Sequence, residues 1–409
     1  MGKYEFKYDY LAQKLERIIE VKDGDRVFFK EIFLIKDIES ILESAYDFDI
    51  EIPESQKLLI VQGGIEKFAF QTKKDGKQLR LQIKKSETEF LKKPSKKYSM
   101  LSSLSFPYFS ELKNIVFPNG TIKFFRNYYP QKYKFDNIYD QLKEYSDFVP
   151  PNGYVPIVVN IIARNNLEAI EKGLNLIDLI RGIWNFSINK RVSNRIHIGP
   201  IEPINTIRLG PTHTLHFSNG QLAQELFWYE PDYNGKSSTW DVENKWKFIS
   251  KDFIWTRNAL NKLPYKNQFL EIFVRYAKSL DTINYETSYL KLWSLLELLT
   301  NTINSNYDKT ISRALFFYKD SSLSKEMIEH LRIFRNKIVH YGESKGEMDS
   351  ALFQIKRIVE KIIWFHLKFA NKFSSIEEFG RFLDLSKDKN NLENEIILRK
   401  KALKFLYKQ

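Results

Sequence analysis

Three polar side chains in one short segment could together do chemistry on a phosphate. The segment LRIFRNKIVHYG, residues 331–342, contains Arg335, Asn336 and His340. A histidine has an ordinary pKa of about 6.5 and can transfer a proton near neutral pH, while an arginine is a permanent cation suited to a phosphate. A histidine and an arginine are sufficient to cleave RNA, because its 2′-hydroxyl can attack the neighbouring phosphate while the arginine stabilises the developing charge. The segment therefore predicts a site for RNA chemistry that would spare DNA.

An amphipathic helix is expected to carry these residues, with Ser324 as its N-cap and Gly342 as its terminator. Its core-facing stripe has apolar residues at steps of three and four: Leu331, Phe334, Ile338 and Tyr341. The three polar residues are not needed for this stripe.

The spacing along the helix limits what one copy can do. Asn336 and His340 are four residues apart and share a face, whereas Arg335 lies five residues from His340, about 140° around the helix. One helix would not bring Arg335 and His340 onto one small ligand unless the arginine bends back, but two copies meeting at a dimer axis would. Alternatively, because R-x4-H matches many helices by chance, His340 caps the last carbonyls of the helix and Arg335 is a surface residue.

The composition limits the other chemistries. The chain has no cysteine, which excludes disulfides, thiolate zinc sites and cysteine nucleophiles. His213 and His216 are three apart on an expected strand and point to opposite faces, which argues against a zinc pair. No cofactor is expected. The first residues are too charged for a signal peptide, and no stretch approaches the ~18 apolar residues of a membrane span, so we expect a cytoplasmic protein with no membrane partner.

The net charge of +13 would concentrate a polyanion near the surface, although AT-biased coding, which enriches Lys, Asn, Ile, Phe and Tyr together, would also produce it. Residues 71–97 contain ten Lys or Arg and three acids. On the strands and loop tip expected there, such a run is either a solvated surface or an RNA contact. The lysines proposed for RNA are Lys73, Lys74, Lys77, Lys92, Lys93, Lys96 and Lys97.

Residues 1–150 are predicted to be a β-rich domain, because their apolar residues alternate with a period of two. Asp75-Gly76 and Asn119-Gly120 favour tight hairpin turns. The expected hairpins join residues 68–70 to 79–83, and residues 115–117 to 122–124.

Pro150 and Pro151 mark the first predicted boundary. Residues 151–245 are predicted to be an α/β region, with a buried strand in VPIVVNIIAR, a helix in NLEAIEKGLNLIDLIRGIWNF and short strands later. Residues 246–409 have a helical period and predict an all-α bundle with charged helices at its end. The expected class is α+β. The helices expected in the bundle span 247–261, 266–281, 286–302, 307–318, 325–341, 349–373 and, as a charged pair, 375–406.

The motif R-N-x-x-x-H is the signature of HEPN domains (higher eukaryotes and prokaryotes nucleotide-binding), and LRIFRNKIVHYG resembles the Apea-like HEPN subgroup. YLKLWSLLELLTN, residues 289–301, is similar to the tryptophan-containing helix of that subgroup, and ISRALFFY, residues 311–318, is similar to its connecting helix with a central arginine. The order and spacing of the three segments also fit. The resemblance covers about residues 260–375 and, more weakly, 154–186.

This resemblance implies an all-α HEPN bundle that forms a homodimer with the two motifs facing each other. Many such proteins are metal-independent endoribonucleases that act as toxins in antiviral defence, as in abortive infection. The expected partners are RNA (tRNA, mRNA or phage RNA) and a phage-derived trigger or regulatory protein. By resemblance, Arg335 binds the phosphate, Asn336 orients it and His340 transfers protons. Other family members are non-catalytic modules that bind nucleotide, RNA or a partner protein.

Glu297, Arg313 and Tyr341 are expected to support the site. Glu297 lies among leucines and needs a partner, which Arg313 or Arg335 could supply, unless it is an exposed helix acid. Arg313 is either half of a buried ion pair or a phosphate contact in the cleft.

Overall fold

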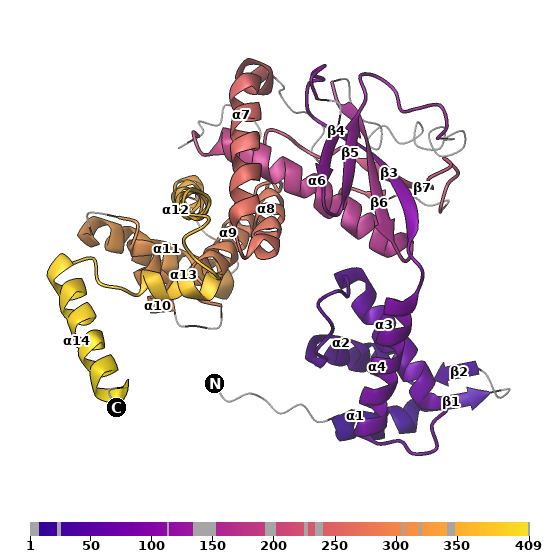
Figure 1. Cartoon of the computed structure of the whole chain (residues 1–409). Coiled ribbons are helices and arrows are strands. Elements are labelled where there is room, and N and C mark those ends of the chain that lie inside the picture. Colours follow the sequence, from indigo (N-terminus) through magenta and orange to yellow (C-terminus); the bar gives the residue numbers. More distant parts are fainter. Residues whose placement is uncertain are drawn as a thin grey trace.

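The computed structural model has three parts that follow one another along the chain: a small helical unit, an antiparallel sheet with one long helix, and a group of helices (Figure 1). The fold is therefore α+β. The residues that the structure describes are 8–22, 26–112, 114–133, 153–192, 202–224, 228–233, 240–303, 305, 307–318, 321–341 and 348–407.

The first part is a helical unit with its own hydrophobic core, to which all four of its helices contribute. Leu15, Leu42, Phe68 and Ile83 are among its fully buried side chains. Its elements are α1 (Tyr8–Ile18), β1 (Ile19–Lys22), β2 (Arg26–Phe29), α2 (Ile32–Ala45), α3 (Glu54–Ala69) and α4 (Gly76–Lys92). The prediction of a β-rich region is wrong here, because apart from the short hairpin β1–β2 the described residues between 8 and 92 form helices and turns.

The hairpin predicted across Asp75-Gly76 is a pair of helices, α3 and α4. The Asp75 carboxylate accepts a hydrogen bond from the Gln78 backbone N–H at 2.9 Å and caps the N-terminus of α4. An aspartate followed by glycine suits a hairpin turn, but aspartate is also among the best helix N-caps. The buried positions of α4, Leu79, Ile83 and Phe90, recur at helical steps, and the short alternation from Leu79 to Ile83 hid this period.

The second part is a six-stranded antiparallel sheet in the order β4-β5-β6-β3-β7-β8. The other predicted hairpin is confirmed, because β4 and β5 pair with Ile115 opposite Ile122. The predicted boundary at residue 150 is not a boundary of this sheet, since β3 before it pairs along its whole length with β6 after it. The strands are β3 (Lys96–Leu104), β4 (Asn114–Phe117), β5 (Gly120–Phe124), β6 (Val155–Ala163), β7 (Thr212–Phe217) and β8 (Trp228–Tyr229).

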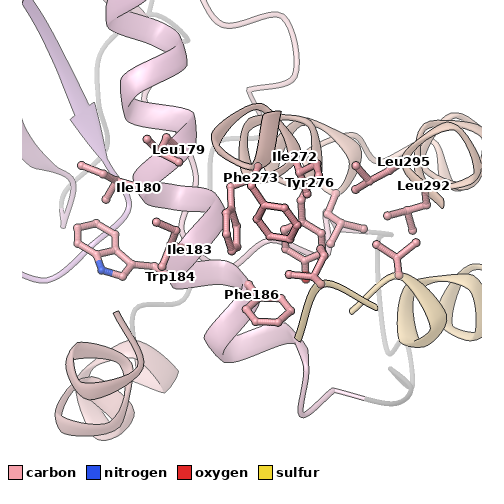
Figure 2. Packing of buried hydrophobic residues seen from close by; sticks show 14 of the residues in the cluster. Leu179, Ile180, Ile183, Trp184, Phe186, Ile272, Phe273, Tyr276, Leu292 and Leu295 are labelled. Atoms are coloured by element: carbon pink, nitrogen blue, oxygen red, sulfur yellow. The ribbon is translucent and has the colours of Figure 1, made fainter. Parts of the chain in front are cut away.

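Helix α6 (Asn166–Asn189) packs on the sheet with one side and on helix α8 with the other. Trp184 points toward the sheet and stacks on Phe106 with ring centroids 4.6 Å apart. Phe186 points the other way, and its ring centre lies 5.9 Å from those of Phe273 and Tyr276 on α8 (Figure 2). One hydrophobic core therefore continues from the sheet through α6 into the last part of the chain.

The last part is helical, as predicted. Helix α9 packs against α8, α11 and α12, and α10 packs against α11. None of the described helices is long and apolar enough to cross a membrane. The helices are α7 (Trp240–Lys262), α8 (Lys266–Ser279), α9 (Tyr285–Leu299), α10 (Tyr307–Leu315), α11 (Ser321–Tyr341), α12 (Met348–Lys368), α13 (Ile376–Leu383) and α14 (Lys389–Tyr407).

The crossing of α6 and α8 depends on Gly182. A Cβ atom added there would lie 2.2 Å from the Phe273 backbone carbonyl oxygen, which can move only if the whole helix moves. We predict that Gly182→Ala lowers the free energy of unfolding by about 1–3 kcal/mol, measured by urea denaturation.

Gly173→Ala is the matched control, because it makes the same change in the same helix. Its nearest neighbour is the flexible end of the Met100 side chain at 2.8 Å. The greater helix propensity of alanine should make this variant as stable as the parent or more so. Equal losses at both positions would contradict the close approach at Gly182.

Candidate functional site

Helix α11 carries the three candidate residues outside the stripe that packs in the core. Leu331, Phe334 and Ile338 are buried as predicted. The helix begins at Ser321, so the prediction of Ser324 as N-cap is wrong, and Ser324 is buried in the first turn. The predictions for the Tyr341 side chain and for Gly342 lie outside the described residues.

Arg335 is half-buried, and its guanidinium carbon lies 5.0 Å from the centre of the Tyr307 ring on α10. Its Nη1 donates to the Asn336 side-chain oxygen at 3.4 Å. A guanidinium over an aromatic face keeps its other N–H groups available and loses little conformational freedom on binding. Tyr307, which the sequence analysis did not single out, therefore helps to orient the cation.

Tyr289 on α9 fixes the helix turn that precedes Arg335. Its hydroxyl donates to the Leu331 carbonyl at 2.5 Å, and its ring packs edge-on against Phe334. Burial raises the pKa of Tyr289 far above its ordinary value, and the nearby charge of Arg335 opposes that rise. Tyr289 therefore stays a neutral hydrogen-bond donor to the helix turn before Arg335.

His340 is exposed in the last turn of α11, and Asn336 one turn earlier is half-buried. Arg335 and His340 form no hydrogen bond with each other. Five residues of helix separate them by about 7.5 Å along the axis as well as by their angle around it. The structure thus places both side chains on one helix end without bringing them together in a single chain.

Glu297 is half-buried on α9, one face of which lies against α11. Its carboxylate accepts a hydrogen bond from the Trp293 indole N–H at 3.0 Å. Neither Arg313 nor Arg335 forms an ion pair with it, so the tryptophan of the neighbouring turn is the partner that this acid was expected to need.

Arg313 is only 3% exposed and forms an ion pair with Asp384, next to α13. Its Nε and Nη2 donate to the two Asp384 carboxylate oxygens at 2.8 and 2.7 Å. Its Nη1 donates to the carbonyls of Thr300 and Asn301, which follow α9. The sequence left two interpretations of Arg313, a buried ion pair and a phosphate contact. These four hydrogen bonds support the buried ion pair.

The basic residues after Gln71 lie mostly on one face of α4 and on the connection to β3. Exposed Lys77, Arg80, Lys84, Lys85 and Lys92 share that face, so a helix replaces the strands and loop tip expected there. Lys73 pairs with Asp75 and Lys84 pairs with Glu87. Lys74 is half-buried. Among the described residues, no ion pair involves the other six candidate lysines, of which four lie at the junction of α4 and β3: Lys92, Lys93, Lys96 and Lys97.

Other histidines serve the core. His213 and His216 are buried on opposite faces of β7, as the strand period predicts. His213 contacts the Ser102 hydroxyl at 2.9 Å, and burial lowers its pKa to about 3. His366 lies between the Tyr265 hydroxyl and the Leu299 carbonyl, and burial also lowers its pKa to about 3. These buried rings are neutral at physiological pH. They therefore do not meet the requirements of a proton donor, which must face solvent.

A network of buried charges joins α6 to the segment after α8, and the sequence analysis missed it. Arg181 donates to Asp178 at 2.5 Å and to both carboxylate oxygens of Asp281 at 3.0 and 2.8 Å. Asn205 donates to Asp281 at 2.7 Å. Arg181 and Asp178 are three residues apart on one helix, which was a signal for this pair, but nothing in the sequence indicated Asp281.

Within the part of the chain that the structure describes, no group of three or more histidine, aspartate or glutamate side chains is arranged to hold a metal ion. Comparison with known proteins finds no matching family model, no matching curated protein and no matching solved structure. The function must therefore be argued from the site itself.

The Arg313–Asp384 pair gives a test of the structural interpretation. We predict that Asp384→Asn lowers the free energy of unfolding at pH 7 by about 1–3 kcal/mol, less than for a fully buried pair because Asp384 is 42% exposed. The Arg313 hydrogen bonds hold the pKa of Asp384 below its ordinary value. The contribution of the pair is therefore complete above about pH 4 and is lost as the pH falls through the lowered pKa.

Urea denaturation at pH 7 and at pH 3 measures both effects, and the difference between parent and variant should shrink at the lower pH. Asp388→Asn is the matched control. The Asp388 side chain accepts from the Asn391 N–H at 2.8 Å as a helix cap, a role that asparagine fills equally well. A loss of stability at Asp388 as large as at Asp384 would contradict the special role of the ion pair.

Proposed function

We propose that this protein is a metal-independent endoribonuclease whose site is formed by Arg335, Asn336 and His340. The observation that carries the proposal is the separation on α11 between the residues that pack in the core and the residues that could do chemistry. Leu331 and Phe334 are buried in the core, while the half-buried cation and amide and the exposed imidazole lie outside that buried stripe. The resemblance to HEPN domains supports the same assignment.

The chemistry follows from the groups present. His340 accepts the proton of the RNA 2′-hydroxyl, and the 2′-oxygen attacks the adjacent phosphorus. The bond from phosphorus to the 5′-oxygen breaks, a protonated imidazole supplies the proton of that leaving group, and Arg335 stabilises the charge on the phosphate oxygens. The products are a 2′,3′-cyclic phosphate and a 5′-hydroxyl. Asn336 already bonds to Arg335 and would hold its guanidinium toward the phosphate.

The geometry of one chain is consistent with a site that two chains complete. Arg335 leans on Tyr307 while His340 points to solvent from the last turn, so one chain offers the cation and another could offer the base. This is the homodimer that the resemblance implies. We further propose that the enzyme is a toxin-like effector of antiviral defence, in which the first helical unit and the sheet respond to a trigger. Both of these points are proposals that the resemblance supports.

The first test is cleavage of tRNA and total RNA by the purified protein in EDTA. We predict that Arg335→Ala and His340→Ala each reduce the rate at least about 100-fold, because each removes a group that acts in the transition state. The products should carry cyclic phosphate ends, which can be identified by their resistance to phosphatase until acid opens the ring.

Arg332→Ala and His330→Ala are matched controls on the same helix. Arg332 pairs with Glu329, and His330 is exposed ten residues before His340. Both controls should cleave at the parental rate. Parental activity in the Arg335 and His340 variants would refute the site assignment, and 3′-hydroxyl products would refute the attack by the 2′-oxygen. RNA binding without cleavage would instead support the alternative of a non-catalytic HEPN module.

The second test concerns the lysines at the junction of α4 and β3. We predict that replacing Lys92, Lys93, Lys96 and Lys97 with alanine weakens RNA binding and reduces the slope of log K against log salt concentration by up to roughly 3, since each phosphate contact on a single strand contributes about 0.7. Binding can be measured by fluorescence anisotropy at several salt concentrations.

The control for overall charge replaces four exposed lysines elsewhere in the chain, Lys247, Lys251, Lys262 and Lys372. It lowers the net charge by the same amount and should change the slope much less. Equal slopes in the two quadruple variants would show that the junction is a solvated surface.

A further inference from the structure

The two faces of the six-stranded sheet have different surroundings. The side chains of Met100 on β3 and Ile161 on β6 lie against Gly173, so both point toward α6. Because side chains alternate between the two faces along a strand, the neighbouring Ser99 and Asn160 point away from α6. These two polar residues therefore lie on the face of the sheet that α6 does not cover.

A row of polar residues crosses that second face. The strand register places four residues in this row, in the order Thr121, Asn160, Ser99 and His216. His216 is already bonded through both ring nitrogens, to the Thr214 hydroxyl at 3.0 Å and the Gly220 carbonyl at 3.1 Å. The other three side chains lie on three adjacent strands, β5, β6 and β3.

The side-chain amide of Asn160 is held in one orientation. Ser99 is only 1% exposed, and its hydroxyl donates to the Asn160 Oδ1 atom at 3.0 Å. This bond occupies the oxygen side of the amide and leaves the two N–H donors of Nδ2 for other partners. Neither these donors nor the Thr121 hydroxyl forms a hydrogen bond with a described residue. The row therefore offers polar groups that a ligand can bind.

These groups line an open cavity of about 570 Å³. Lys97 and its cross-strand partner Ile162 also line it, and both side chains are exposed. Lys97 forms no ion pair with any described residue, whereas the other lysine of the lining, Lys172, pairs with Glu168. Two residues of strand separate Lys97 from the polar row, which is about 7 Å. A free cation, an apolar surface and unused donors are thus close together.

The turn between β4 and β5 forms a further side of the cavity through Pro118, Asn119 and Gly120. This turn lies directly against β6, because a Cβ atom added at Gly120 would lie 2.5 Å from the Asn160 carbonyl oxygen. The close contact fixes the turn relative to the polar row. The cavity is therefore formed before any ligand binds, as is usual for sites of small molecules.

The lining determines the class of ligand. The volume lies within the roughly 300–1,000 Å³ that small-molecule sites occupy. Inorganic phosphate would contact Lys97 but leave the apolar Ile162 unused, and an apolar molecule would leave the donors of Asn160 without partners. A nucleotide has all the matching parts: a phosphate, hydroxyl and carbonyl acceptors, and a flat base.

We propose that this cavity binds a nucleotide. Lys97 binds the phosphate, Asn160 and Thr121 bind the polar groups of the sugar or base, and the base packs on Ile162. Ser99 is a positioning residue, since it acts through the Asn160 amide.

Two sources supply this chemistry. One is a free nucleotide, and the other is a nucleotide within an RNA chain that follows the lysines at the junction of α4 and β3, to which Lys97 belongs. Only the second source rests on the proposed ribonuclease function. The binding of a nucleotide is inferred from the cavity alone.

Titration calorimetry of the full chain with the four ribonucleoside 5′-monophosphates tests the site. We expect at least one of them to bind with a dissociation constant below about 1 mM. The corresponding nucleoside and inorganic phosphate should each bind at least about tenfold more weakly, because each fills only part of the cavity.

Two variants test the assigned residues. Lys97→Gln removes the cation, and Asn160→Asp keeps the shape and the Ser99 bond but replaces two donors with a negative charge near the phosphate. Each should weaken nucleotide binding at least about tenfold. Lys123→Gln and Asn114→Asp are matched controls, since they make the same changes on exposed residues of β5 and β4 outside the cavity. Both controls should bind like the parent.

Competition with a labelled oligouridine RNA, in a chain that carries His340→Ala to prevent cleavage, identifies the source. Displacement of the RNA by the nucleotide indicates an RNA residue in the cavity, and binding without displacement indicates a free nucleotide. Three results would overturn the proposal: no nucleotide binding up to about 1 mM, inorganic phosphate binding as tightly as the nucleotide, or equal affinities in the cavity variants and their controls. Calorimetry does not measure cleavage, so the cavity and the ribonuclease function can fail independently.

Discussion

The burial of α6 between the sheet and α8 is the constraint on which the rest of the structure depends. Every residue from Leu176 to Asn189 is buried, so this helix has no solvent-facing side over its second half. Its polar side chains must therefore find partners inside the protein, since an unpaired buried charge or amide costs several kcal/mol. Arg181 is bound by Asp178 and Asp281, and Asn185 exchanges hydrogen bonds with the Ile207 backbone. These contacts fix the chain before β7 and after α8, and through α8 they position α9 and the helices that follow.

The helical part of the fold was the most predictable from the sequence, because long amphipathic helices repeat their pattern many times. The helices from α8 to α12 were expected within five residues of their observed bounds, whereas α7 begins at Trp240, seven residues before its expected start. The prediction of strands failed for the described residues between 8 and 92. Phe68, Phe70 and the residues from Leu79 to Ile83 occupy a few alternating positions, and so short a pattern fits a helix as well as a strand. The competing role of Asp75 as an N-cap decided the outcome. The position of Pro150 was equally ambiguous, because a strong breaker marks the end of an element and says nothing about whether the next strand returns to the same sheet.

For the candidate site, the sequence predicted which residues α11 buries but not what surrounds the others. The stripe of Leu331, Phe334 and Ile338 follows from helix geometry alone. The partner of Arg313 does not, because Asp384 lies 71 residues further along the chain and only the packing of α13 brings it near. The contact of Arg335 with Tyr307 has the same origin, since it depends on how α10 crosses α11. Contacts between elements distant in sequence are set by tertiary packing, for which a single sequence carries no periodic signal.

The same packing relates the candidate site to α14. Helix α10 packs against α11, and Tyr307 near its start supports the cation of the site. At the other end of α10, the Leu315 carbonyl accepts a hydrogen bond from Lys387, directly before α14. A short helix therefore contacts the candidate site at one end and the base of α14 at the other. Hydrogen bonds and an ion pair hold the C-terminal end of α10, and at its N-terminal end the Tyr307 ring contacts the Arg335 guanidinium. The position of the Arg335 guanidinium therefore depends on how α10 is held as well as on the residues of the motif.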